Sequence, residues 1–259
     1  MKEFLIFGFK QAYASIFGGY LLCVMAITHY WYPLESLHRY DTIFIAALSF
    51  QVLMLVFKGE SRREAVVIFA FHIIATLMEL FKTSDSIAAW HYPEEYIFGI
   101  GNVPLFTGFM YSAVGSYLAR VSRIFHLSYS RYPPTRYTLI LVAAVYVNFF
   151  SHHFVIDLRW LLLAIAAMLF WKTQVHFTVI TRTRKMPILL GWLLITAFIW
   201  LAENMATYLN IWIYPHQTEH WEMVPLAKLS SWYLLMLLSF VLIKSINAAQ
   251  YCEQKVTTS

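Results

Sequence analysis

Long apolar runs separated by short polar breaks dominate the pattern of this chain. A helix needs roughly 20 apolar residues to cross the hydrocarbon core of a bilayer. The runs lack the strict alternation of apolar and polar positions that marks membrane β-strands, so helices are favoured. We predict an all-α, polytopic membrane protein that forms a single integral-membrane domain over residues 1–259. Its eight transmembrane helices are expected at Ala12–Tyr30, Thr42–Phe57, Ala65–Phe81, Val103–Val121, Tyr137–Phe150, Leu158–Ile180, Met186–Leu209 and Leu226–Ile246.

Composition supports this class of protein. Hydrophobic residues make up 60% of the chain and charged residues only 13%, whereas soluble domains carry about 25% charged residues. This balance excludes a disordered chain, a nucleic-acid partner and a secreted disulfide scaffold. Cys23 lies in the first apolar run and Cys252 in the polar tail, so no disulfide is expected between them.

The basic residues predict the topology. Only four of the 19 Lys and Arg residues, namely Arg39, Lys82, Arg159 and Lys228, fall on one side of the predicted membrane. Cytoplasmic loops carry the excess of Lys and Arg in membrane proteins. Both termini are therefore expected in the cytoplasm, with membrane lipids as the surroundings of the helices.

Three landmarks recur in the same order along the chain and indicate an internal repeat. The first set is Glu79, Trp90-His91-Tyr92-Pro93 and Val103-Pro104-Leu105, and the second is Glu203, Trp212-Ile213-Tyr214-Pro215 and Val224-Pro225-Leu226. We predict two parallel four-helix halves, at about residues 1–130 and 131–259. The alternative is that Trp-Tyr-Pro clusters merely mark the membrane interface and the end of a helix.

Pro104 is expected in the first turn of the helix that begins at Val103, where its missing N–H costs nothing. Asn102 is then placed to cap the start of that helix.

Glu79 and Glu203 are the acids expected inside the membrane. A carboxyl group in hydrocarbon is costly, so such residues usually face the interior of the bundle and mark functional sites. We predict that the two acids act as an acid/base or binding pair in a shared pocket, with His72 or Asn204 as supporting partners. The alternative is that these polar groups only join helices by hydrogen bonds, and the charge state of the acids is left open.

Histidines on the outer side make a metal site an alternative to consider, at His152, His153, His216 and His220. His216 and His220 would share one face if their segment were helical. Zinc needs three or four converging ligands, and the chain contains no standard metal-binding motif. No metal and no cofactor are therefore assigned.

The chain resembles the YoaT-like family of bacterial integral-membrane proteins of unknown function. The residues that carry the resemblance are Thr76–Thr83, Trp90–Glu94, Val103–Tyr111, Val114–Tyr117 and Arg120. The resemblance implies a multipass protein of the bacterial inner membrane and brings no catalytic residues. Pro93-Glu94-Glu95 also resembles the acidic motif of membrane carotenoid cyclases and hydratases, over a few residues only.

Three functions remain open. The first is an intramembrane enzyme or binder that acts on a lipid or isoprenoid through Glu79 or Glu203. The rings of Trp90, Tyr111, Trp200 and Trp212 would then stabilise a developing cation. The second is a proton-coupled transporter of a small solute, whose halves rock about the two acids and which requires a homo-oligomer for room. The third is a non-catalytic scaffold that binds a partner through basic cytoplasmic loops.

Overall fold

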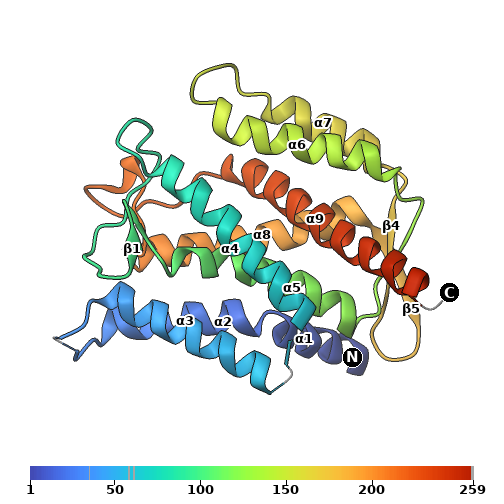
Figure 1. The fold of residues 1–259 in the computed structure, drawn as a ribbon, viewed down its shortest axis with the longest axis horizontal. Helices are drawn as coiled ribbons and strands as arrows, with labels where there is room; N and C mark the ends of the chain where they lie inside the picture. Colours follow the sequence, from blue (N-terminus) through green and yellow to red (C-terminus); the bar gives the residue numbers. More distant parts are fainter. Residues whose placement is uncertain (35, 58, 61, 258–259) are drawn as a thin grey trace. The chain divides into compact units, whose positions relative to one another are not determined.

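The computed structural model describes residues 1–34, 36–57, 59–60 and 62–257 (Figure 1). Its described part is mostly helical, with one 3₁₀ turn, η1 at Pro215–Gln217, before the last helix. The α-helices are α1 Lys2–Ala14, α2 Ile16–Tyr30, α3 Arg39–Val56, α4 Arg62–Lys82, α5 Thr107–Ile124, α6 Thr135–Ser151, α7 Arg159–Phe170, α8 Ile188–Tyr208 and α9 Lys228–Thr257.

Each of the eight predicted apolar runs contains a helix, but the first run is broken and three others begin or end in strands. The first is split into α1 and α2, which are bent by 67° at Ser15. The Ser15 hydroxyl donates to the Gln11 carbonyl at 2.8 Å, a local hydrogen bond of the kind that bends helices. The prediction of one helix over Leu158–Ile180 is wrong, because α7 ends at Phe170 and the rest of the run enters a strand.

Two small antiparallel sheets are missing from the all-α prediction. One joins β3 Ser128–Ser130, β4 Gln174–Thr178 and β5 Thr183–Pro187 in the order β3-β4-β5. The alternation of polar and apolar residues in β4 is typical of a strand, and this local pattern overrides the surrounding apolar run.

The other sheet pairs β1 Gly99–Ile100 with β2 Val103–Pro104, across a turn in which Gly101 has a φ of +55°. Pro104 therefore lies in a strand and not in the first turn of a helix, since α5 begins only at Thr107. The Asn102 side chain donates to the Thr83 carbonyl at 3.1 Å. It thus caps the end of α4, whereas the prediction placed it at the start of α5.

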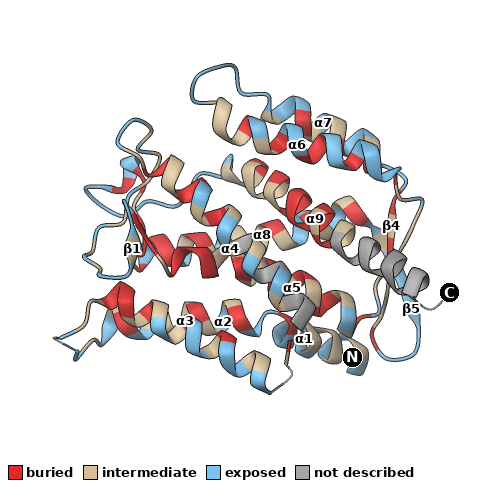
Figure 2. Cartoon of the chain, in the orientation of Figure 1, coloured by how far each residue is buried: buried red, intermediate tan, exposed pale blue. Residues whose placement is uncertain are grey.

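The contacts divide the chain into two compact units. The first unit comprises residues 1–10, 121–199 and 226 onward, and in it α6 and α7 lie side by side with α9 packed against both (Figure 1). The second unit comprises residues 11–120 and 200–225, and in it α2 lies beside α3. A run of mostly buried positions from Val103 to Phe109 contributes to its core (Figure 2).

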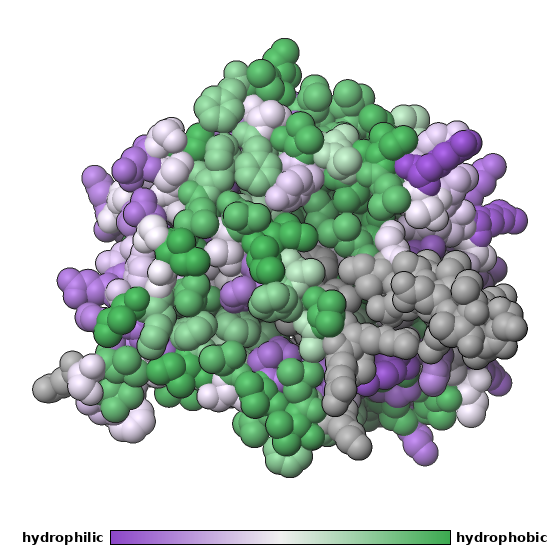
Figure 3. All heavy atoms as spheres, viewed as in Figure 1, coloured by the Kyte–Doolittle hydropathy of each residue, from purple (hydrophilic) through white to green (hydrophobic). Residues whose placement is uncertain are grey.

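Three helices in the described part of the chain are long and apolar enough to cross a membrane. They are α3, α8 and the Lys228–Ser245 portion of α9, and α1 with α2 adds a fourth if the bent pair forms one span. Large apolar side chains such as Val52, Phe57 and Phe198 are exposed, and hydrophobic residues cover much of the face seen in Figure 3. Such a surface would be unfavourable in water. The helices and this surface indicate a membrane-associated protein.

A buried ion pair within the second unit joins α5 to the segment after α3. An Arg120 guanidinium nitrogen lies 2.7 Å from a Glu60 carboxylate oxygen, and both side chains are at most 2% exposed. Ser116 donates to the same carboxylate at 2.5 Å and Gln51 donates to its other oxygen at 2.5 Å. Arg120 also donates to the Ala14 carbonyl at 3.3 Å, so the pair holds the end of α1.

Arg120→Leu is expected to lower the free energy of unfolding by about 3–5 kcal/mol, because it leaves the Glu60 carboxylate buried without its cation. Thermal unfolding of the detergent-solubilised protein measures this loss. Arg184→Gln is the control, since Arg184 pairs with Glu3 at an exposed site and its loss should leave the midpoint unchanged. The double variant Glu60→Leu/Arg120→Leu should recover much of the loss. An unchanged midpoint in Arg120→Leu would contradict a stabilising role for the buried Glu60–Arg120 ion pair.

Candidate functional site

Glu79 lies near the end of α4 and is 1% exposed. One of its carboxyl oxygens accepts hydrogen bonds from the Trp90 indole nitrogen at 2.9 Å and from the Tyr92 hydroxyl at 2.7 Å. The other oxygen accepts from the Tyr111 hydroxyl at 2.7 Å. Trp90 and Tyr92 come from the loop that follows α4, and Tyr111 comes from α5. Both oxygens of this acid are therefore occupied by aromatic donors.

Within the described residues, Glu79 has hydrogen bonds to these aromatic side chains and no ion pair. Burial of Glu79 favours the neutral acid, whereas the three hydrogen bonds donated to it favour the carboxylate. Tyrosine hydroxyls both donate and accept hydrogen bonds. Tyr92 or Tyr111 can therefore accept a hydrogen bond from the O–H group of a neutral Glu79. Burial, and next the adjacent Glu79 carboxyl, raise the pKa of Tyr92 well above its usual value. Tyr92 therefore keeps its own proton.

Glu203, in α8, has an equivalent arrangement. It is 3% exposed and accepts a hydrogen bond from the Tyr214 hydroxyl at 2.6 Å. Tyr214 occupies the same place in the second Trp-x-Tyr-Pro cluster as Tyr92 in the first. Burial, and next the Glu203 carboxyl, raise the pKa of Tyr214 well above its usual value. Each copy of the repeated landmarks thus forms the same acid–tyrosine hydrogen bond.

The two Trp-x-Tyr-Pro loops pair with each other. The His91 N–H donates to the Ile213 carbonyl at 3.0 Å, and the Ile213 N–H donates to the His91 carbonyl at 2.9 Å. The Trp90 and Tyr214 rings also meet edge to face, with centroids 6.1 Å apart. Because Trp90 bonds to Glu79 and Tyr214 bonds to Glu203, the two acids belong to one connected network in the second unit.

The aromatic residues expected to surround the acids gather around this network. Trp212 belongs to a buried cluster with Tyr40 and Phe106, and both Trp90 and Trp200 pack against that cluster. Tyr111 bonds directly to Glu79. These rings form an apolar surrounding for the acids.

Among the described residues, neither predicted supporting partner forms a hydrogen bond with Glu79 or Glu203. The His72 ring meets the Phe109 ring edge to face at 4.8 Å, and a Cβ at Gly108 would clash with the His72 ring, so glycine permits this approach. Asn204 donates to the Trp200 carbonyl at 2.8 Å and accepts from the Val224 N–H at 2.9 Å. His72 and Asn204 therefore act in packing and in holding backbone segments.

No group of three or more His, Cys, Asp or Glu residues in the described ranges gathers closely enough to hold a metal ion. The His152 and His153 rings lie 4.1 Å apart. The 3₁₀ turn η1 covers only Pro215–Gln217, so a helix does not place His216 and His220 on one face. His220 instead lies 3.0 Å from a Glu222 carboxylate oxygen.

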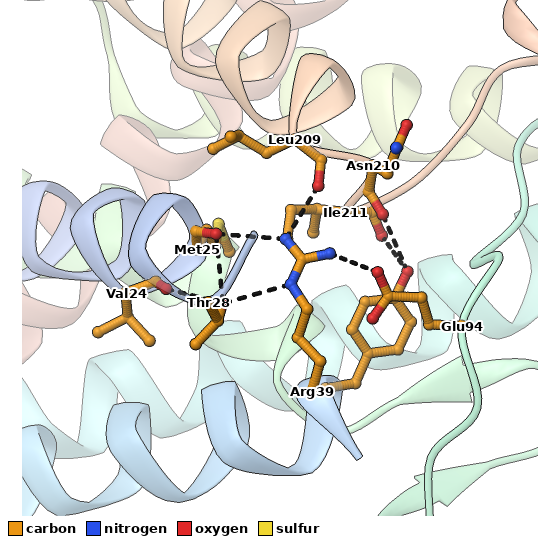
Figure 4. Close-up of polar contacts among 9 residues, drawn as sticks. Val24, Met25, Thr28, Arg39, Glu94, Leu209, Asn210 and Ile211 are labelled. Atoms are coloured by element: carbon orange, nitrogen blue, oxygen red, sulfur yellow. Dashed lines mark hydrogen bonds and ion pairs between the residues drawn. The ribbon is translucent and has the colours of Figure 1, made fainter. Parts of the chain in front are cut away.

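Arg39, at the start of α3, lies outside the set of site residues predicted from the sequence. It is 8% exposed and forms an ion pair with Glu94 (Figure 4). It also donates to the Met25 carbonyl at 3.2 Å, the Leu209 carbonyl at 2.9 Å and the Thr28 hydroxyl at 3.3 Å. The available signal was that Arg39 is one of few basic residues on the predicted outer side, where Glu94 also lies.

The next two residues of α3 are buried as well. The Tyr40 hydroxyl donates to the Asn210 and Ile211 carbonyls at 3.2 and 2.9 Å. The Asp41 carboxylate accepts from the Ile97 and Phe98 backbone N–H groups, at 2.9 and 2.8 Å for the shorter contacts. These bonds reach the segments that flank both Trp-x-Tyr-Pro clusters.

The fold and the site define a mostly helical, membrane-associated protein with two buried acids beneath paired loops. A family model described as "Protein of unknown function (DUF817)" matches residues 3–240, so the chain belongs to this family. It is 40% identical over 257 residues to "Uncharacterized protein YoaT" of Bacillus subtilis strain 168, covering 99% of this chain and 96% of that protein. The expected YoaT-like relationship is therefore confirmed, whereas these comparisons do not support the weaker resemblance to carotenoid cyclases.

A solved structure shares the fold at low sequence identity. The crystal structure of a cross-linked MvINS trimer matches with a TM-score of 0.51 and 15% identity, covering 73% of this chain and 96% of that chain. At this identity the likeness shows the fold alone.

Tyr92→Phe and Tyr214→Phe remove the equivalent hydrogen bond to each acid. Each variant is expected to lose about 0.5–1.5 kcal/mol of unfolding free energy, the typical net contribution of one hydrogen bond. Thermal unfolding of both variants beside an exposed control, Tyr30→Phe, measures the two losses. A loss in only one of the two variants would contradict the equivalence of the acid–tyrosine pairs.

Proposed function

We propose that this protein binds a lipid or an isoprenoid inside the membrane and acts on it through Glu79, with Glu203 as the second acid of the site. The observation that carries this proposal is the set of partners around Glu79. All of them are aromatic donors, and none supplies a positive charge. An apolar ligand suits such walls better than a hydrophilic solute, which needs polar groups to replace its hydration.

The proposed chemistry is proton transfer to a carbon–carbon double bond. A neutral Glu79 gives its proton to one alkene carbon, and the π electrons of the double bond form the new C–H bond. The resulting carboxylate is stabilised by the hydrogen bonds of Trp90, Tyr92 and Tyr111. The carbocation is stabilised by aromatic faces, and loss of a proton from its neighbouring carbon to a carboxylate restores the acid and completes an isomerisation of the double bond.

The ligand needs a route to an acid whose oxygens are both occupied. Trp90 and Tyr92 lie on the loop after α4, whereas Tyr111 lies within α5. A loop moves at lower cost than a packed helix. We therefore propose that displacement of the first Trp-x-Tyr-Pro loop admits the ligand and frees one oxygen of Glu79.

Solvent extracts of the purified protein test this function by mass spectrometry. The wild-type extract is expected to contain one enriched lipid or isoprenoid class together with its converted product. Glu79→Gln keeps the shape of the side chain and removes the titratable proton, so its extract should hold the ligand without the product. Glu95→Gln, at an exposed carboxylate, is the control. Identical extracts from all three proteins, or no enriched lipid, would exclude the proposal.

One observation favours a second candidate, the proton-coupled transport of a small solute. The two acid–tyrosine pairs are equivalent, and their loops pair reciprocally through His91 and Ile213. A transporter with parallel repeats uses such equivalence to alternate access around a central site. If this candidate is correct, the extracts contain no enriched lipid. A water-soluble solute should then dissipate a pH gradient in proteoliposomes.

The proposed membrane arrangement has eight spans in two parallel four-helix repeats, with both termini in the cytoplasm. The basic residues on the predicted cytoplasmic side and the repeated landmarks support it. A homo-oligomer is also part of the proposal, since the similar MvINS structure is a cross-linked trimer and the chain is small for eight spans.

Cysteine labelling in intact bacterial cells tests the topology. In a variant without Cys23 and Cys252, Ser86→Cys should react with a membrane-impermeant maleimide and Thr183→Cys should react only after lysis. Both positions are exposed, so a lack of reaction is not due to burial. Labelling of both from the same side would overturn the proposed topology.

A further inference from the structure

We propose that Arg39, Tyr40 and Asp41 are positioning residues that hold both Trp-x-Tyr-Pro loops over the acids and thereby control access to them. We call these three consecutive residues the α3 clamp. The proposal rests on the proposed function, because it assumes that a ligand reaches Glu79. It adds the residues that regulate this access.

Arg39 and Asp41 hold the first loop at positions that come before and after Tyr96 in the sequence. Arg39 pairs with Glu94, which is two residues after Tyr92. Asp41 accepts from the Ile97 and Phe98 N–H groups at 2.9 and 2.8 Å. The backbone that carries Tyr92 is therefore fixed immediately beyond the cluster, and this fixes the hydroxyl that donates to Glu79.

Tyr40 and Arg39 hold the second loop. The Tyr40 hydroxyl bonds to the carbonyls of Asn210 and Ile211, directly before Trp212. Arg39 donates to the Leu209 carbonyl at 2.9 Å (Figure 4). One guanidinium thus joins the segment beyond the first cluster to the segment before the second.

The α3 clamp acts on both loops together, because the loops are bonded to each other. The loops are joined by the two hydrogen bonds between His91 and Ile213. The Tyr40 ring also packs edge to face against the Tyr92 ring, with centroids 6.2 Å apart. Loosening the first loop should therefore weaken the pairing and reach the second loop.

The Arg39–Glu94 ion pair is the place where the clamp can open. The Arg39 side chain is 8% exposed, whereas the Glu94 side chain is 32% exposed. Glu94 can thus leave for water at a lower cost than Arg39. Arg39 keeps its bonds to backbone carbonyls after Glu94 has left, so opening releases the loop without unfolding the ends of α2 and α8.

Hydrogen exchange of the detergent-solubilised full chain, read by mass spectrometry, tests the clamp. Glu94→Gln removes the charge and is expected to raise the exchange rate of the His91 and Ile213 amides about tenfold, which corresponds to about 1.4 kcal/mol of opening free energy. Glu94→Asp keeps the carboxylate and should restore much of the protection. Glu95→Gln is the matched control, because Glu95 is exposed and lies 3.9 Å from His38, and its exchange should equal that of the wild type.

Two further measurements test the separate contacts of the clamp. Tyr40→Phe, which keeps the ring, should raise exchange at Ile213 and not at the Ile97 amide, whereas Asp41→Asn should raise exchange at Ile97 first. A hydrophobic carbodiimide, which modifies neutral buried carboxyls, should label Glu79 faster in Glu94→Gln than in Glu95→Gln.

The proposal is overturned if exchange in Glu94→Gln is unchanged, rises only after residue 94, or rises equally in Glu95→Gln. Failure of the proposed function gives a different result, in which the exchange pattern appears as expected while the extracts hold no enriched lipid. An increase at both loops with faster labelling of Glu79 supports the clamp.

Discussion

The need to satisfy two buried carboxyl groups is the constraint on which the second unit depends. Glu79 and Glu203 lie near the ends of apolar helices, where an unsatisfied acid would cost several kcal/mol. Tyr92 and Tyr214 supply equivalent hydrogen bonds of 2.7 and 2.6 Å. To bring these hydroxyls inward, each loop must fold back over the helix that precedes it. The two loops then lie close enough to pair through His91 and Ile213.

Membrane chemistry explains why the site is built from aromatic residues. Trp and Tyr combine a large apolar ring with one polar group, so they bury area and still donate a hydrogen bond. Trp90, Tyr92 and Tyr111 satisfy Glu79 without a counter-ion. A carboxyl group that is buried among rings and held by hydrogen-bond donors suits an acid that gives up and regains a proton, which proton transfer to a lipid and proton-coupled transport both require. The equivalence of the two acids fits both activities, and the ligand that co-purifies separates them.

Two arginines in this unit are also buried, each in an ion pair with a glutamate. Arg39, at the start of α3, joins Glu94 to backbone carbonyls at the ends of α2 and α8. Arg120 pairs with Glu60 and bonds to the end of α1. Guanidinium groups suit this task because five N–H donors allow several bonds at once. Charges that are expensive to bury thus become the points at which separate helices and loops are joined.

The sequence by itself determined the helical class, the position of each apolar run and the repeated Glu and Trp-x-Tyr-Pro landmarks, because hydrophobicity and turn residues act locally along the chain. It also identified Glu79 and Glu203 as buried acids, since a carboxyl group within an apolar run is too costly to leave facing lipid. Only the tertiary structure decided their partners. The hydrogen bonds from Tyr111 to Glu79 and from Arg39 to Leu209 join residues 32 and 170 positions apart, and no spacing rule relates such distant positions. The strand at Gln174–Thr178 was missed although polar and apolar residues alternate in it, because the apolar run before it favours a helix and the strand forms only with its partners β3 and β5.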